Sequence, residues 1–176
     1  ETFQVGESPS EVVWTQPTQI GLFAWIVNQG GVNDPDGSVS LWWSGAGGYA
    51  VTTNTGSVLG QLQDNIDSPG KIFSDTATLN MYVPNTAGDT VTEGTITFQG
   101  GSIFATIQPL VNNSREVGPN PTSMTLTGGL GSGSRLAFVS LAGGGQIAVY
   151  DFNSSFTSPA LYNLPGVRQV FSAWDQ

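Results

Sequence analysis

The side chains that could carry out a reaction in this chain are limited to carboxylates, phenols and one lysine, Lys71. The sequence has neither histidine nor cysteine among its 176 residues. Imidazole bases, thiol nucleophiles, disulfides, and imidazole or thiolate metal ligands are therefore missing from its repertoire. What remains is acid–base chemistry by oxygen acids or a hard cation held by oxygen ligands. This composition favours a protein that binds over an enzyme, and we expect no enzymatic activity.

Two acids that fall within expected strands, Glu93 and Asp151, are the best candidates for paired carboxylate chemistry. Hydrolysis of a glycosidic bond needs two carboxyl groups about 5 to 9.5 Å apart in a cleft. Glu93 shares its strand face with threonines, and Asp151 alternates with aromatic neighbours, so both are predicted to face solvent. Because no spacing rule brings the two acids together, a carboxylate-dependent glycan hydrolase is the least favoured function.

The segment DPDG at residues 34–37 offers two further carboxylates, Asp34 and Asp36. This is good turn chemistry, since proline fixes φ and glycine completes the turn. Calcium also binds carboxylate and backbone oxygens, but the EF-hand pattern fails because Val39 and Gly45 stand where it requires Gly and Glu. We expect a turn here, with a calcium site of another kind as the open alternative and no other cofactor.

Two adjacent tryptophans, Trp42 and Trp43, lie in an expected strand. Neighbouring side chains on a strand point to opposite faces, which places Trp43 in the core and Trp42 among serines on the other face. Trp42 has three interpretations: it is covered by a nearby segment, it anchors a protein interface, or it is a stacking platform for a sugar ring. As a ligand-binding group it is joined by Tyr49 and Asn54 in the segment that follows.

The charge of the chain limits its partners. Thirteen acids against four bases give a net charge of −9. Binding to nucleic acid requires a basic surface, so it is not expected. Membrane insertion is not expected either, because no apolar run approaches the roughly 20 residues that cross a bilayer.

Apolar and polar residues alternate with period two along much of the chain, and the alternating segments are separated by Gly-, Asn- and Pro-rich turns. This pattern predicts an all-β fold, namely an antiparallel β-sandwich or barrel of jelly-roll-like form. The expected strands with this alternation are at residues 11–15, 39–43, 77–83, 90–98, 102–108, 134–141 and 146–152.

Three segments depart from simple alternation. Residues 57–67 carry apolar side chains at helical spacing and predict one short helix. Residues 19–27 are apolar on both faces, as in a central strand that is covered on its back; alternatively, Phe23 and Trp25 lie in an oligomer interface. We interpret residues 1–11 as a linker or N-terminal strand, followed by a single β domain over residues 12–176.

The C-terminal residues 147–171 contain an aromatic-Asp pair, an Asn-x-x-Phe-Thr segment, a tyrosine, and an Arg-Gln pair. With these elements the segment resembles the end of the projecting domain of capsid proteins from small icosahedral RNA viruses, nearest to the fish nodavirus type. The elements are Tyr150 with Asp151, Asn153 with Phe156 and Thr157, Tyr162, and Arg168 with Gln169, which begin the final strand in that family.

The resemblance implies a β-rich spike on the virion surface that self-associates into dimers or trimers. It also implies surface loops that attach to a host receptor, either protein or glycan. Some members of that group bind calcium through closely spaced aspartates, a role that would fall on Asp34 and Asp36, although a proline separates them here. The alternative function is a secreted β-sandwich lectin or carbohydrate-binding module, with Trp42 and Tyr49 stacking on the sugar.

Overall fold

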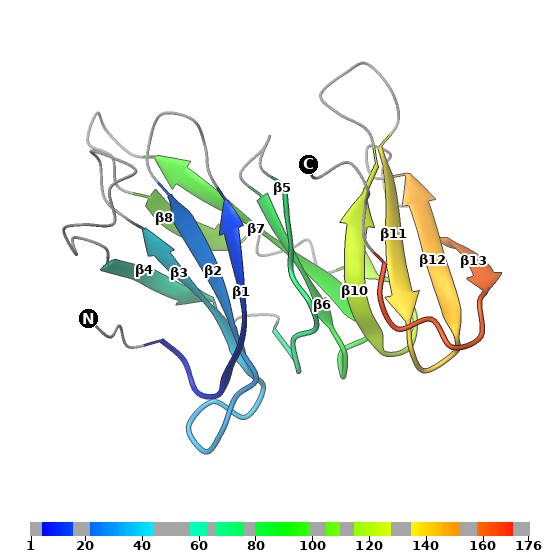
Figure 1. The fold of residues 1–176 in the computed structure, drawn as a ribbon, viewed down its shortest axis with the longest axis horizontal. Helices are drawn as coiled ribbons and strands as arrows, with labels where there is room; N and C mark the ends of the chain where they lie inside the picture. Colours follow the sequence, from blue (N-terminus) through cyan, green and yellow to red (C-terminus); the bar gives the residue numbers. More distant parts are fainter. Residues whose placement is uncertain are drawn as a thin grey trace.

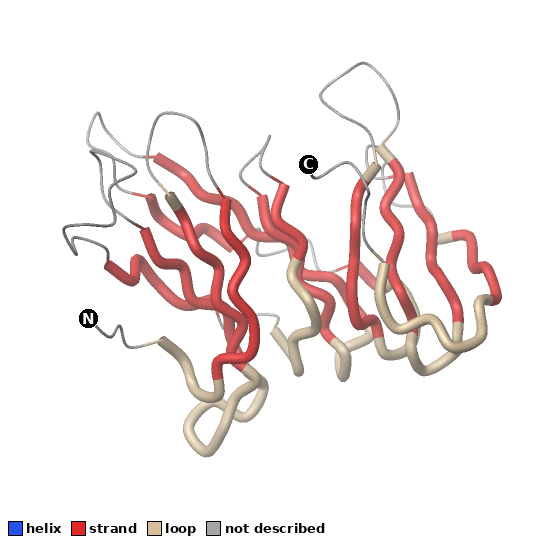
Figure 2. Tube along the Cα trace, viewed as in Figure 1, coloured by secondary structure: helices blue, strands red, loops and turns tan. Residues whose placement is uncertain are grey.

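The computed structural model of the chain describes residues 5–15, 22–43, 57–62, 66–75, 80–98, 105–109, 115–127, 135–151 and 158–170. Within these residues the chain forms thirteen β-strands and no helix, as Figure 2 shows. The strands make three sheets, two of four strands and one of five, and every pairing between strands is antiparallel. The predicted all-β class is therefore confirmed.

Apart from the short β9 (Arg115–Glu116), which pairs with β7 (Thr90–Phe98), neighbouring strands within each sheet are also consecutive along the chain (Figure 1). Sheet A contains β1 (Pro9–Thr15), β2 (Phe23–Asn28), β3 (Ser38–Trp43) and β4 (Ser57–Leu62). Sheet B contains β5 (Phe73–Asp75), β6 (Asn80–Asn85), β7 (Thr90–Phe98), β8 (Ala105–Pro109) and the short β9 (Arg115–Glu116). Sheet C contains β10 (Pro121–Leu126), β11 (Leu136–Leu141), β12 (Gln146–Asp151) and β13 (Ala160–Asn163).

Sheet B is a middle layer with a core on each side, and its strand β6 contributes to both. Met81 and Val83 of β6 pack into the first core, against sheet A, whereas Tyr82 packs into the second core, against sheet C. In Figure 1, sheet A lies at the left, sheet C at the right, and β5 and β6 stand between them. The first core contains Phe23, Trp25, Val27, Val39, Leu41, Ile66, Ile72, Met81 and Val83. The second core contains Tyr82, Val91, Val117, Met124, Leu126, Ala137, Val139, Leu141, Ala148 and Tyr150.

The short helix expected over residues 57–67 is wrong for the part that the structure describes. Residues 57–62 form β4, which pairs with β3 and places Gly60 opposite Leu41. The backbone groups along this edge of β3 gain partners in this way, whereas a helix would leave them unpaired. Helical spacing of a few apolar residues is a weak preference, and a central glycine weakens it further by about 1 kcal/mol.

Strand β2 is buried along its whole length, as expected for a strand that is apolar on both faces. Phe23 and Trp25 are 0% exposed and belong to the first core. The interpretation of residues 19–27 as a covered central strand therefore describes β2. The alternative, an oligomer interface at Phe23 and Trp25, is wrong for this fold because these side chains have no surface left to offer another chain.

Candidate functional site

The outer face of sheet A, which points away from sheet B, is the surface on which aromatic side chains gather. The strand register places Trp14 of β1 opposite Ala24 of β2, and Ala24 opposite Trp42 of β3. Paired residues on adjacent strands project to the same side of a sheet. Both indoles therefore stand on the outer face, with only the small side chain of Ala24 in the strand between them.

The two indoles contact each other across Ala24. Their ring centroids are 6.0 Å apart with an interplanar angle of 88°, an edge-to-face arrangement that is favourable for aromatic pairs. Trp14 is 55% exposed, and Val12 next to it on the same face is 50% exposed. We call this surface the tryptophan face; it consists of Val12, Trp14, Ala24, Ile26 and Trp42.

The predicted division of the adjacent tryptophans is confirmed. Trp43 packs against the first core and stacks on Phe23 with ring centroids 6.3 Å apart, whereas Trp42 lies on the opposite side of the sheet with Trp14. The sequence interpretation missed Trp14. The signal was present in the alternation of residues 11–15, which puts Val12 and Trp14 on one face and Val13 on the other.

The other end of this outer face is polar and covered. The side-chain amide of Asn28 donates hydrogen bonds to Ser38 Oγ at 3.1 Å and Ser40 Oγ at 3.0 Å. The backbone N–H of Gly6 donates to Ser40 Oγ at 3.3 Å. A Cβ at Gly6 would lie 2.6 Å from Asn28 Nδ2, so glycine permits this close approach. The N-terminal segment thus covers the polar end, while Val12 and Trp14 remain exposed at the other.

The turn expected at residues 34–37 is present. The amide of Gly37 donates to the carbonyl of Asp34 at 3.3 Å, and Gly37 has a φ of 84°, which glycine adopts without strain. Nearby, the exposed carboxylate of Glu7 accepts a hydrogen bond from the backbone amide of Asn33 at 3.0 Å, and this bond lowers the pKa of Glu7. Among the described residues, no three or more His, Cys, Asp or Glu side chains group as metal ligands.

The expectation that Glu93 faces solvent is wrong. Glu93 is 5% exposed and lies opposite Tyr82 in the register of β6 and β7, on the side of sheet B that meets sheet C. The reason is the third sheet, which covers a face of β7 that would be open in a two-layer sandwich. Asp151 follows Tyr150, whose ring enters the second core, so Asp151 lies on the outer face of sheet C. Sheet C separates the two carboxylates, and they do not form a catalytic pair.

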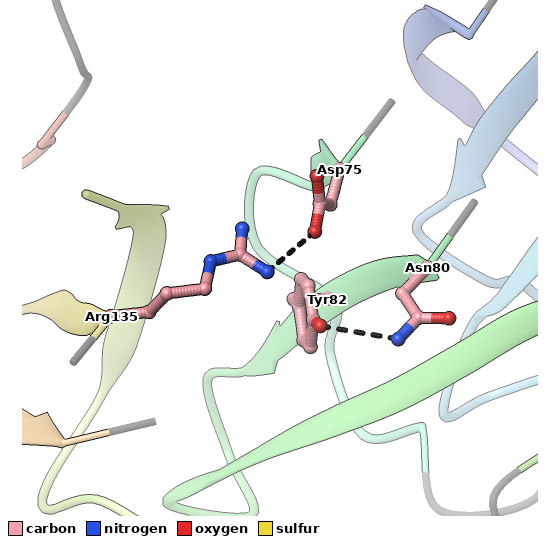
Figure 3. Close-up of polar contacts among 4 residues, drawn as sticks. All are labelled: Asp75, Asn80, Tyr82 and Arg135. Carbon is pink, nitrogen blue, oxygen red and sulfur yellow. Dashed lines mark hydrogen bonds and ion pairs between the residues drawn. The ribbon is translucent and has the colours of Figure 1, made fainter. Parts of the chain in front are cut away.

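Glu93 belongs instead to a buried polar cluster between sheets B and C, part of which Figure 3 shows. Arg135 Nη1 lies 2.8 Å from Asp75 Oδ2, and Asn80 Nδ2 donates to the Tyr82 hydroxyl at 3.4 Å. Burial raises the pKa of Tyr82 to about 12, and the nearby charges of Glu93 and Asp75 act in the same direction. Because both acids are buried, this cluster is part of the contact between two sheets and offers no open carboxylate to a substrate.

The remaining expected ligand-binding residues, Tyr49 and Asn54, lie outside the described residues. No protein-family model matches the chain, and no curated protein matches it. In the part of the chain that the structure describes, no helix has the length and apolar character to span a membrane. The tryptophan face is therefore the candidate site, and its geometry suits binding, since an exposed indole can cover an apolar side chain or the C–H face of a sugar ring.

Proposed function

We propose that the protein is a non-catalytic recognition domain of the capsid-projection kind, which attaches a virus particle to a receptor on the host-cell surface. The tryptophan face is the surface that makes this contact. The observation that carries the proposal is the exposure of Trp14 and Val12 beside Trp42 on the outer face of sheet A. Tryptophan is over-represented among the residues that dominate binding energy, because it combines a large apolar area with an N–H donor.

Composition and resemblance also support the proposal. Charged residues make up only 10% of the chain, against about 25% in an average domain. The surface therefore relies on neutral polar and aromatic groups, which suit contact with a receptor better than acid–base chemistry. The capsid context rests on the resemblance of residues 147–171 to the end of a projecting domain.

A secreted carbohydrate-binding module is the second candidate, and the same tryptophan face favours it. The exposed indole of Trp14, against which Trp42 packs edge-to-face, offers a stacking surface for a sugar ring. The two candidates differ in what the surface recognises when it is removed from any particle. A carbohydrate-binding module binds isolated oligosaccharides, whereas a projection domain whose receptor is a protein binds intact cells but no isolated oligosaccharide.

The test measures binding of the fluorescently labelled chain to cultured fish cells and to an array of defined oligosaccharides. We expect Trp14→Ala to weaken cell binding by at least about tenfold, which corresponds to about 1.4 kcal/mol for a central interface residue. Leu136→Ala, which truncates an exposed apolar side chain on sheet C, is the matched control and should bind like the unchanged protein. Circular dichroism of both variants verifies that the fold is retained.

The outcomes separate the candidates. Binding to cells that Trp14→Ala weakens and Leu136→Ala does not would support the proposed function. Binding to isolated oligosaccharides, with the same dependence on Trp14, would favour the carbohydrate-binding module. Cell binding that is unaffected by Trp14→Ala, or no binding to either probe, would contradict the proposal.

A further inference from the structure

The three sheets of the molecule are built to one plan. Each begins with a residue in the left-handed region directly before a proline; these residues are Ser8, Ser68 and Asn120, with φ of 54°, 52° and 51°. The carbonyl of each accepts a hydrogen bond of 3.0 Å from the first residue after the second strand of its sheet, namely from the amides of Gln29, Thr86 and Ala142. Each proline pairs with the residue before that donor, in the pairs Pro9 with Asn28, Pro69 with Asn85, and Pro121 with Leu141. The residues of one sheet can therefore be matched to those of another by counting from the proline.

This matching relates the tryptophan face to a face that is buried elsewhere in the molecule. The residues of the tryptophan face, Val12, Trp14, Ala24, Ile26 and Trp42, correspond in this order to Met124, Leu126, Ala137, Val139 and Tyr150 of sheet C. All five residues of sheet C belong to the second core, where they pack against sheet B. Met124 and Leu126 are 3% and 5% exposed, whereas Val12 and Trp14 are 50% and 55% exposed. The same surface is thus covered on sheet C and open on sheet A.

The corresponding face of sheet B is buried as well. It carries Ile72, Met81 and Val83, which pack into the first core against sheet A. Equivalent hydrogen bonds join the successive sheets. The Gln29 side chain donates to the carbonyl of Pro69 at 2.8 Å, and the Thr86 hydroxyl donates to the carbonyl of Pro121 at 3.1 Å. At both junctions, therefore, this face of a sheet is covered by the face of another antiparallel sheet.

We propose that the tryptophan face docks on an exposed β-sheet of a receptor protein, whose side chains cover Val12 and Trp14 as sheet B covers Met124 and Leu126. The inference rests on the proposed function and names the receptor as a protein rather than a glycan. Two sheets that pack face to face interdigitate the side chains of alternate positions. The partner strands should therefore present apolar side chains at every second position toward the tryptophan face.

Charge complementarity defines the partner further. Residues 1–62, which include all of sheet A, contain five acids and no base, and none of the five side chains of the tryptophan face is charged. A partner sheet with an apolar centre and lysines or arginines around it is attracted to this surface, whereas a second copy of this chain would bring the same acids to the contact. A second copy also has no open sheet C to continue the series. The backbone of residues 168–170 bonds to Ser123 and Ser140 on its outer face, and Ser140 is 0% exposed.

Binding of the labelled full chain to pre-treated fish cells tests whether the receptor contact is protein. Proteinase K should lower binding by at least about tenfold, whereas periodate, which cleaves the vicinal diols of sugars, should lower it by less than about twofold. Val12→Asn should weaken binding to untreated cells by about five- to tenfold, because a packed sheet buries Val12 along with Trp14. Val32→Asn makes the same change at a 96% exposed loop position and should bind like the unchanged protein.

Photo-cross-linking tests whether the contact is a β-sheet. The Val12→p-benzoylphenylalanine variant is irradiated on intact fish cells, and the peptide attached to the benzophenone is sequenced. We expect a peptide of a cell-surface protein in which apolar and polar residues alternate, with lysine or arginine nearby. Adding Trp14→Ala to this variant should remove the adduct. Val32→p-benzoylphenylalanine, the matched control, should not label the same peptide.

The outcomes separate this inference from the proposed function. Loss of binding after periodate, or binding that survives proteinase K, would overturn the protein receptor while Trp14-dependent attachment to cells still stood. An adduct on a sugar, on a second copy of this chain, or on a peptide without alternation would overturn the sheet contact in the same way. Cells that do not bind the chain, or that bind Trp14→Ala equally well, would contradict the proposed function, and this inference would fall with it.

Discussion

The two cores of the molecule share strand β6, yet they differ in chemistry. The first core, between sheets A and B, consists of aliphatic and aromatic side chains that include Phe23 and Trp25. The second core, between sheets B and C, is apolar at its centre, but the cluster of Asp75, Glu93 and Arg135 lies between the same two sheets. Hydrophobic burial therefore accounts for the packing of sheet A on sheet B. The packing of sheet B on sheet C also depends on the neutralisation of buried charge.

The largest effect is expected in the first core. Trp25→Ala removes the largest fully buried side chain and leaves a cavity between sheets A and B. We expect the free energy of unfolding to fall by about 3 to 5 kcal/mol, measured by denaturant titration. Val32→Ala, at an exposed loop position, should change it by less than about 0.5 kcal/mol. A loss below about 1 kcal/mol for Trp25→Ala would contradict a tightly packed first core.

The second-largest loss of stability is expected in the cluster of Asp75, Glu93 and Arg135. Arg135→Met leaves the buried carboxylate of Asp75 without its cation, so the free energy of unfolding should fall by about 3 kcal/mol, the lower end for buried pairs. We choose the lower end because the Arg135 side chain keeps some exposure. Combining this change with Asp75→Asn should recover part of the loss. A double-mutant cycle should give a coupling of about 1 to 3 kcal/mol, and additive effects would show that the ion pair adds nothing to the second core.

A smaller effect distinguishes the cores at alkaline pH. The pKa of Tyr82 is raised to about 12 in the folded protein, so between about pH 10 and 12 the unfolded chain loses this proton while the folded chain keeps it. Unfolding then releases a proton, and stability that is complete below about pH 10 should fall by about 2 to 3 kcal/mol across this window. Tyr82→Phe should remove the dependence, whereas Tyr162→Phe should retain it. Equal pH profiles for the two variants would contradict the assignment.

Much of the fold could be predicted from alternation, because half-buried strands display it. Strand β7 spans residues 90–98 as expected, and β3 and β12 begin within one residue of their predicted starts. The number of sheets could not be predicted in this way. Period two shows that a strand has two different faces, but it does not show whether a further sheet covers the polar one. For this reason the alternation predicts that Glu93 faces solvent, whereas the structure buries it.

The candidate site was predicted in part. Alternation was enough to separate Trp42 from Trp43, since it depends on one strand alone. The pairing of Trp42 with Trp14 depends on the register of β1 with β2 and of β2 with β3, across connections whose lengths differ. Register depends on the geometry of the connecting turns as well as on the hydrophobic pattern, and alternation within a single strand shows only which face a side chain occupies.

The layered order of the sheets keeps the two outer layers of the molecule apart. Sheet B stands between the tryptophan face on sheet A and the edge strand β13 on sheet C, so occupation of one outer layer leaves the other accessible (Figure 1).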